Sequence, residues 1–144
     1  MKKLVNAMIL GTLIMPSVVS AGTAIIPSFV VWQGAVSCYQ VSNVSNVSAN
    51  VIMKFYGKNG ESYTGPLTSS SDIATLESPF SLKPRQTVNV CLDISSHNYG
   101  YGVIESSSAG PGQSFLVAVG QYNAKHTDNT MVERSIPINN GMPF

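Results

Sequence analysis

Residues 51–60 read Val-Ile-Met-Lys-Phe-Tyr-Gly-Lys-Asn-Gly, and this stretch decides the fold class. Val51, Met53 and Phe55 alternate with the residues between them, a period of two that places one face of an extended strand against a core. Asn59-Gly60 follows closely, and this dipeptide tolerates the positive φ of a tight hairpin turn. The stretch therefore predicts a strand, a turn and a short returning strand.

The same period of two recurs along the chain, whereas helical spacing is scarce. Val88, Val90 and Leu92 repeat it, and other segments are rich in the Val, Ile, Tyr and Phe of strands. These other segments are 29–33, 35–42, 100–105, 115–122 and 131–138. Runs of Gly, Pro, Ser and Asn separate them. The pattern predicts an all-β fold, an antiparallel β-sandwich of about seven to nine strands, because one-sided sheets bury their apolar faces against each other. A closed barrel is the alternative.

The start of the chain has the order of a bacterial secretory signal peptide. Two lysines precede an apolar run at 4–15, and small residues close the segment at 19–21. The run is shorter than the roughly 20 residues of a membrane span. We expect cleavage that separates a signal peptide, 1–21, from a single domain, 22–144, with no transmembrane span in the mature form. The predicted location is periplasmic, cell-surface or extracellular.

Charge is scarce in this sequence. Charged residues make up 10% of the chain, and the 123 residues left after cleavage carry 6 basic and 7 acidic side chains. Because phosphate binding needs clustered Lys and Arg, and these are scattered singly, nucleic acid is excluded as a partner. The low charge leaves little repulsion to oppose association.

Cys38 and Cys91 are the only cysteines, and both fall in the predicted mature domain. Because an exported chain enters a compartment where thiols oxidise, we predict a disulfide between them. Closing a loop over the 53 positions that separate them stabilises the fold by at most about 4 kcal/mol in the chain-entropy model. Neither cysteine lies in a C-x-x-C motif or at metal-finger spacing from a histidine, so a redox or zinc site is not expected.

Catalytic residue types are present without a catalytic arrangement. His97 and His126 are the only histidines, both lie in polar segments, and no G-x-S-x-G elbow marks a nucleophile. The carboxylates are spread singly, and Asp128 with Asn129 offers two oxygen ligands where calcium takes six to eight. We therefore expect no catalytic residue, no metal and no cofactor, and a protein that is not an enzyme. A secreted hydrolase is the less favoured alternative.

Residues 98–102, Asn-Tyr-Gly-Tyr-Gly, carry the binding hypothesis of this sequence. Aromatic faces beside flexible glycines stack on sugar rings or on apolar partner groups. Asn98, Tyr99 and Tyr101 are accordingly the predicted ligand-binding residues. The alternative is structural, with Tyr99 and Tyr101 on one face of a strand, packing a sheet edge.

Three segments follow one another in a recognisable order. They are a strand with a polar end at 38–43, the hairpin at 51–60, and a Leu-x-Pro-x-x-Thr-x-x-Val edge at 82–90. This order resembles the immunoglobulin-like sandwich modules of bacterial exported proteins. The resemblance implies that fold but carries over no binding residue, because the class shares no functional motif. Trp32 precedes the first cysteine here, whereas in antibody domains the tryptophan follows it.

The leader, the single disulfide and the β-rich chain also resemble those of chaperone-assembled pilin subunits. Such a subunit lacks one strand of its sandwich and receives an extension from a neighbour. Residues 22–29 are the candidate extension, although Pro27 would remove a ladder hydrogen bond. The segment 136–144 lacks the long alternating terminal strand of those subunits.

We expect an exported, non-enzymatic β-sandwich that acts as a cell-envelope or secreted binding module, with a protein or glycan partner at the cell surface. The alternative is a self-associating structural subunit of a surface fibre or homo-oligomer, built through unpaired strand edges.

Overall fold

The computed structural model describes residues 21–32, 34–93, 98–125 and 130–144, and eight β-strands form within these ranges. The strands are β1 (Ala21–Val31), β2 (Ala35–Asn43), β3 (Ala49–Gly57), β4 (Phe80–Leu82), β5 (Thr87–Cys91), β6 (Asn98–Ser108), β7 (Leu116–Lys125) and β8 (Met131–Pro137), followed by a 3-10 turn, η1 (Asn139–Gly141). Across the described ranges no helix is long and apolar enough to span a membrane. Residues 1–20 of the expected signal peptide lie outside them, so the cleavage stays a prediction.

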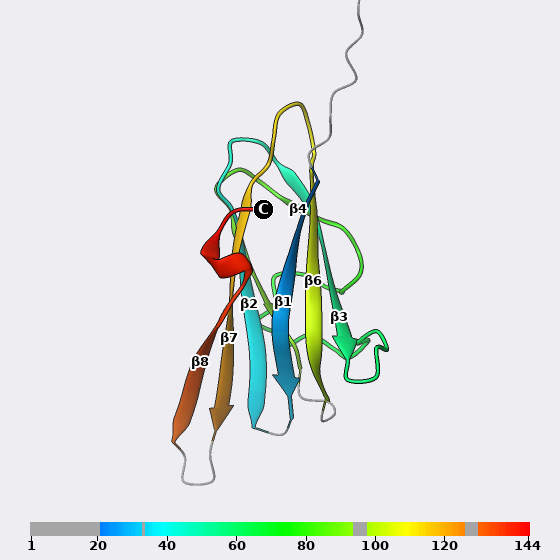
Figure 1. Cartoon of the computed structure of the whole chain (residues 1–144), viewed down its shortest axis with the longest axis vertical. Coiled ribbons are helices and arrows are strands. Elements are labelled where there is room, and N and C mark those ends of the chain that lie inside the picture. Colours follow the sequence, from blue (N-terminus) through cyan, green and yellow to red (C-terminus); the bar gives the residue numbers. More distant parts are fainter. Residues whose placement is uncertain (1–20, 33, 94–97, 126–129) are drawn as a thin grey trace, which may run out of the picture.

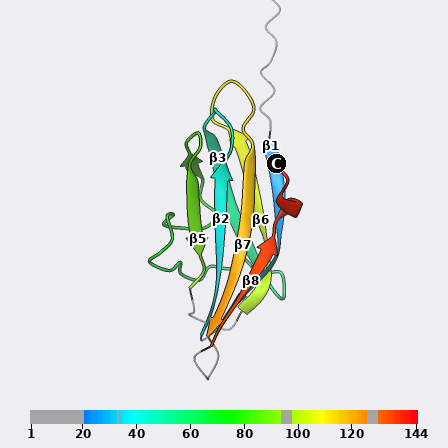
Figure 2. The same ribbon diagram turned by 90° about the vertical axis from the view of Figure 1, so that its left-hand side faces the viewer.

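The strands form two layers (Figures 1 and 2). Sheet A has the order β1-β6-β3-β4 and sheet B the order β5-β2-β7-β8, with every neighbouring pair antiparallel. The prediction of an all-β antiparallel sandwich of seven to nine strands is confirmed. The sheets are separate, so the described part of the chain is not a closed barrel.

The core lies between the two inner faces. In β3 the predicted inward residues Val51, Met53 and Phe55 are fully buried. The ring of Phe55 contacts Phe29 of β1 and Tyr39 of β2, with centroids 5.6 and 5.2 Å apart. Each fully buried large apolar side chain contributes roughly 1.5–3 kcal/mol, so this alternation supplies most of the driving force for packing the sheets.

The first strand is longer than the sequence predicts. Residues 22–29, the candidate donor extension, belong to β1 and pair with β6 of the same chain. The register shifts between Ile26 and Phe29, around Pro27, as expected for a residue that has no N–H to donate. Ala24, Ile26 and Phe29 are buried, so this segment fills a strand position in its own sandwich.

Other element boundaries also differ from the expectations. The strand predicted after the hairpin is reduced to a single bridge between Tyr56 and Ser62. Strands β6 and β7 extend past the predicted ends at 105 and 122, to Ser108 and Lys125, and β4 was not predicted.

The predicted disulfide between Cys38 and Cys91 is confirmed. These residues are directly opposite each other in β2 and β5, with Cα atoms 4.0 Å apart, so the bridge lies within sheet B. In antibody domains the disulfide joins the two sheets and packs on a tryptophan. Trp32 here is 41% exposed beyond the end of β1, and β1 pairs with β6, whereas the first strand of a constant-type immunoglobulin domain pairs with the second.

Candidate functional site

The tyrosines singled out in the sequence lie on the outer face of sheet A. Tyr99 and Tyr101 belong to β6 and are 48% and 45% exposed. Their neighbours Gly102 and Ile104 point inward, as the alternation requires. The two rings therefore share one solvent-facing surface, and their role in binding stays a prediction.

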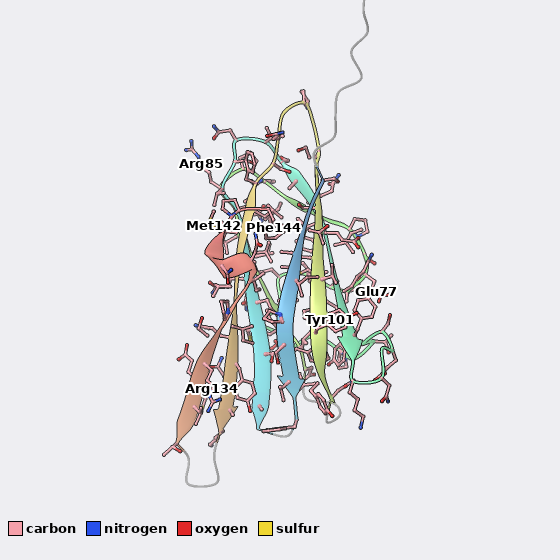
Figure 3. All side chains as sticks on the ribbon, viewed as in Figure 1. Glu77, Arg85, Tyr101, Arg134, Met142 and Phe144 are labelled. Atoms are coloured by element: carbon pink, nitrogen blue, oxygen red, sulfur yellow. A yellow bond between two sulfur atoms is a disulfide. The ribbon has the colours of Figure 1, made fainter. Side chains whose placement is uncertain are left out.

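A third tyrosine joins them from another strand. Tyr56 of β3 is directly opposite Tyr101, and their rings stack with centroids 5.2 Å apart at 28°. Lys58 in the following turn places its Nζ atom 6.0 Å from the centre of the Tyr99 ring. We call Tyr56, Tyr99 and Tyr101 the tyrosine strip (Figure 3 labels Tyr101).

Asn98, the third predicted ligand-binding residue, is the first residue of β6. Its Oδ1 atom accepts a hydrogen bond of 2.8 Å from the backbone N–H of Tyr99. This oxygen has a partner within the chain, and the role of Asn98 in binding stays a prediction.

Glycines on the opposite face of β6 position the strip. A Cβ atom at Gly102 would lie 2.7 Å from the ring of Phe55, and one at Gly100 would overlap the carbonyl oxygen of Tyr56. The absence of these Cβ atoms lets the core rings press directly against the backbone of β6. In the segment 99–102 the glycines therefore allow close packing on the inner face of β6, and the tyrosines form its outer face.

The outer face continues from the strip into an open groove. This groove, called the sheet A groove below, has a volume of about 750 Å³ and is lined by segments of β1, β3, β4 and β6. Its lining includes Thr23, Asn50, Ile52, Phe80, Ser81 and Glu105. Hydroxyl, amide and carboxylate groups lie there beside three apolar side chains, those of Ile52, Pro79 and Phe80, so the groove suits a ligand that offers both hydroxyls and C–H groups.

An ion pair lies between strip and groove. Lys54 Nζ donates to both carboxylate oxygens of Glu105, at 2.7 and 2.8 Å. The hydrogen bond to Glu105 raises the pKa of Lys54, so the lysine keeps its positive charge throughout the physiological range. The tyrosine strip, the ion pair and the groove all include residues of β6 between Tyr99 and Ser107, a segment roughly 26 Å long.

The catalytic and metal candidates of the sequence are two histidines and two oxygen-bearing side chains. His97, His126, Asp128 and Asn129 lie outside the described residues. Within the described ranges, no group of three or more His, Cys, Asp and Glu side chains is arranged to hold a metal ion.

The comparisons with known proteins identify a fold and no family. No family model matches the chain, and no curated protein matches it. The fold is similar to the crystal structure of Thermotoga maritima 1070, with a TM-score of 0.51 and 11% sequence identity, over 85% of this chain and 91% of that one. At this identity the similarity concerns the fold alone.

Proposed function

We propose that this protein is an exported, non-enzymatic binding module, and that the outer face of sheet A binds an extended glycan. The observation that carries the proposal is the tyrosine strip in line with the sheet A groove on one sheet face. The faces of Tyr56, Tyr99 and Tyr101 take the apolar faces of sugar rings. The hydroxyl and amide side chains of the groove then take sugar hydroxyls as hydrogen-bond partners.

The disulfide supports the proposal that the protein is exported. Structural disulfides form and persist in oxidising compartments, and the bridge between Cys38 and Cys91 joins two strands of the sandwich. The leader pattern of residues 1–21 points the same way. We place the module in the periplasm, on the cell surface or outside the cell.

A self-associating subunit has less support. The segment expected to reach a neighbour, 22–29, is already a strand of its own sheet. Side chains of β2 also occupy backbone groups of that strand: Ser37 bonds to Val30 and Tyr39 to Ser28.

The proposal is tested by sedimentation of the mature protein with insoluble polysaccharides such as peptidoglycan, chitin and cellulose. We expect retention on at least one of them, weakened about tenfold in Tyr101→Ala, because an aromatic stacking contact contributes roughly 1–1.5 kcal/mol. The matched control is Phe115→Ala, which removes an aromatic ring that is 43% exposed and lies outside the tyrosine strip and the sheet A groove.

The melting temperatures of both variants establish that folding is intact, since both rings are substantially exposed. Absence of wild-type retention on every polymer contradicts the proposal. Equal retention of Tyr101→Ala and wild type contradicts the assigned surface.

A further inference from the structure

A second cavity lies away from the tyrosine strip and is lined by residues near the edge strands β1 and β8. These two strands lie on the same side of the sandwich, as the ribbon in Figure 2 shows. Its volume is about 340 Å³, within the range of small-molecule sites. Its lining includes Val30, Trp32, Ser37, Tyr122, Arg134 and Ile136.

Strand register explains why these side chains meet. Ser37, Tyr122 and Arg134 are directly opposite one another across β2, β7 and β8, so they project from the same face of sheet B. Ser37 is fully buried, which identifies this face as the inner one. Tyr122 is only half-buried and Arg134 is exposed, so burial of this face decreases towards β8.

The polar groups at the base of the cavity are already satisfied. The Ser37 hydroxyl accepts from the N–H of Val30 at 3.0 Å and donates to its carbonyl oxygen at 2.9 Å. Ser28 also lines the cavity, and its carbonyl oxygen accepts a hydrogen bond of 2.8 Å from the hydroxyl of Tyr39. With these groups occupied, the base of the cavity offers a ligand little hydrogen bonding.

The walls are aromatic and aliphatic. Trp32 and Tyr122 form an edge-to-face pair with ring centroids 6.4 Å apart. Val30 and Ile136 add branched aliphatic surface beside them. These walls favour a ligand with an apolar body.

Arg134 supplies the charge of the cavity (Figure 3). In the described part of the chain, no carboxylate lies within 4.0 Å of its guanidinium group. The ion pair between Lys54 and Glu105 lies on the other sheet. The neighbouring Glu133 accepts a hydrogen bond of 2.9 Å from Gln121. The positive charge beside the apolar walls therefore has no counterion from the described chain.

We propose that this cavity binds an amphiphilic monocarboxylate, an aliphatic chain of medium length that ends in one carboxylate. The chain packs between Trp32, Tyr122 and Ile136, and the carboxylate pairs with Arg134, whose planar guanidinium matches it in geometry. This second site is independent of the glycan surface.

Trp32 is the only tryptophan of the chain, so its fluorescence reports the cavity directly. Titration of the mature protein with octanoate, below its micelle concentration, is expected to give a saturable change in emission. Octanamide has the same chain without the charge, and acetate has the charge without the chain. We expect each to bind at least tenfold more weakly than octanoate.

Arg134→Gln tests the charge pairing. We expect it to weaken octanoate binding at least tenfold and to leave octanamide binding unchanged. Arg85→Gln is the matched control, because Arg85 is also exposed but lies in the β4–β5 turn, and it should bind octanoate as the wild type does. Tyr101→Ala should also bind octanoate normally, which separates this site from the proposed function. The proposal is overturned if octanoate gives no saturable change, if octanoate and octanamide bind equally, or if Arg134→Gln binds octanoate as the wild type does.

Discussion

At the scale of single residues, the phenol of Tyr39 links the core to the pH dependence of stability. The side chain is fully buried, its hydroxyl donates to Ser28, and burial raises its pKa well above the usual value. The folded protein holds this proton where the unfolded chain, with a tyrosine pKa near 10, releases it. The free energy of unfolding therefore falls as the pH rises above about 10.

Tyr39→Phe should cost about 1 kcal/mol of stability at pH 8, since the carbonyl oxygen of Ser28 loses its donor. At pH 11 the wild type loses about 1.4 kcal/mol that the variant does not, so the difference should vanish or reverse. Urea denaturation at the two pH values measures this. The control is Tyr101→Phe, which removes an exposed hydroxyl. A difference between Tyr39→Phe and wild type that is the same at both pH values would contradict the linkage.

The residues of the candidate site were only partly predictable. Their period of two places Tyr99 and Tyr101 on one face, whichever strand they pair with. Their partner Tyr56 lies 45 positions earlier, and only the register of β3 with β6 puts it opposite Tyr101. The pairing of Arg134 with Tyr122 likewise depends on register, which a single sequence does not specify.

At the scale of elements, the disulfide holds β5 at the edge of sheet B. Cys38 and Cys91 are opposite residues of β2 and β5, and β5 has only five residues. Replacing both cysteines by alanine should lower the free energy of unfolding by about 2–4 kcal/mol, because the unfolded chain regains the entropy of an open loop. Urea denaturation of the oxidised wild type and the double variant measures the change. The reduced wild type is the control and should resemble the variant. A loss below about 1 kcal/mol would show that strand pairing alone fixes β5.

Elements with strong alternation were predicted, and those without it were not. Val51, Met53 and Phe55 carry enough apolar surface to identify β3. The first half of β1 was not predicted, because Gly22 and Ala24 are small and Pro27 indicates the end of a strand. In the structure the strand continues past Pro27 with a shift in register. Strand β4 has three residues, too few to display a period, and it forms because Phe80 and Leu82 pair with β3.

At the scale of the whole molecule, the fold limits pairing with other chains at three of its four sheet edges. Ser37 and Tyr39 bond to backbone groups of β1. At β5, the Asp72 carboxylate accepts from the N–H of Asn89, and the Ser71 hydroxyl accepts from the N–H of Cys91. Strand β4 has only three residues, and very short edge strands are poor templates for pairing.

The fourth edge, β8, is exposed over most of its seven residues, and its charged side chains are what oppose pairing with another chain. In a symmetric antiparallel pair of two β8 strands, the central residue faces its own copy. If the pair is centred on Arg134, the two guanidinium groups face each other. If it is centred on Glu133, the two carboxylates face each other. Like charges directly opposite each other destabilise such a pair. A pair centred nearer the C-terminal end of β8 includes Pro137, which has no N–H to donate to the ladder.

We therefore expect a monomer in solution, although the low overall charge gives little general repulsion. Light scattering of the mature protein should give one monomeric species, unchanged by a peptide that copies residues 22–30, because β1 already occupies that position. Replacing both Glu133 and Arg134 by serine should promote association at high protein concentration, since it removes the like-charge contacts from the β8 edge. Replacing Lys54 and Glu105 by serine is the matched control: it also removes one charge of each sign, but from a sheet face, and should leave the monomer intact. Wild-type oligomers that the peptide dissociates would instead establish strand exchange between subunits.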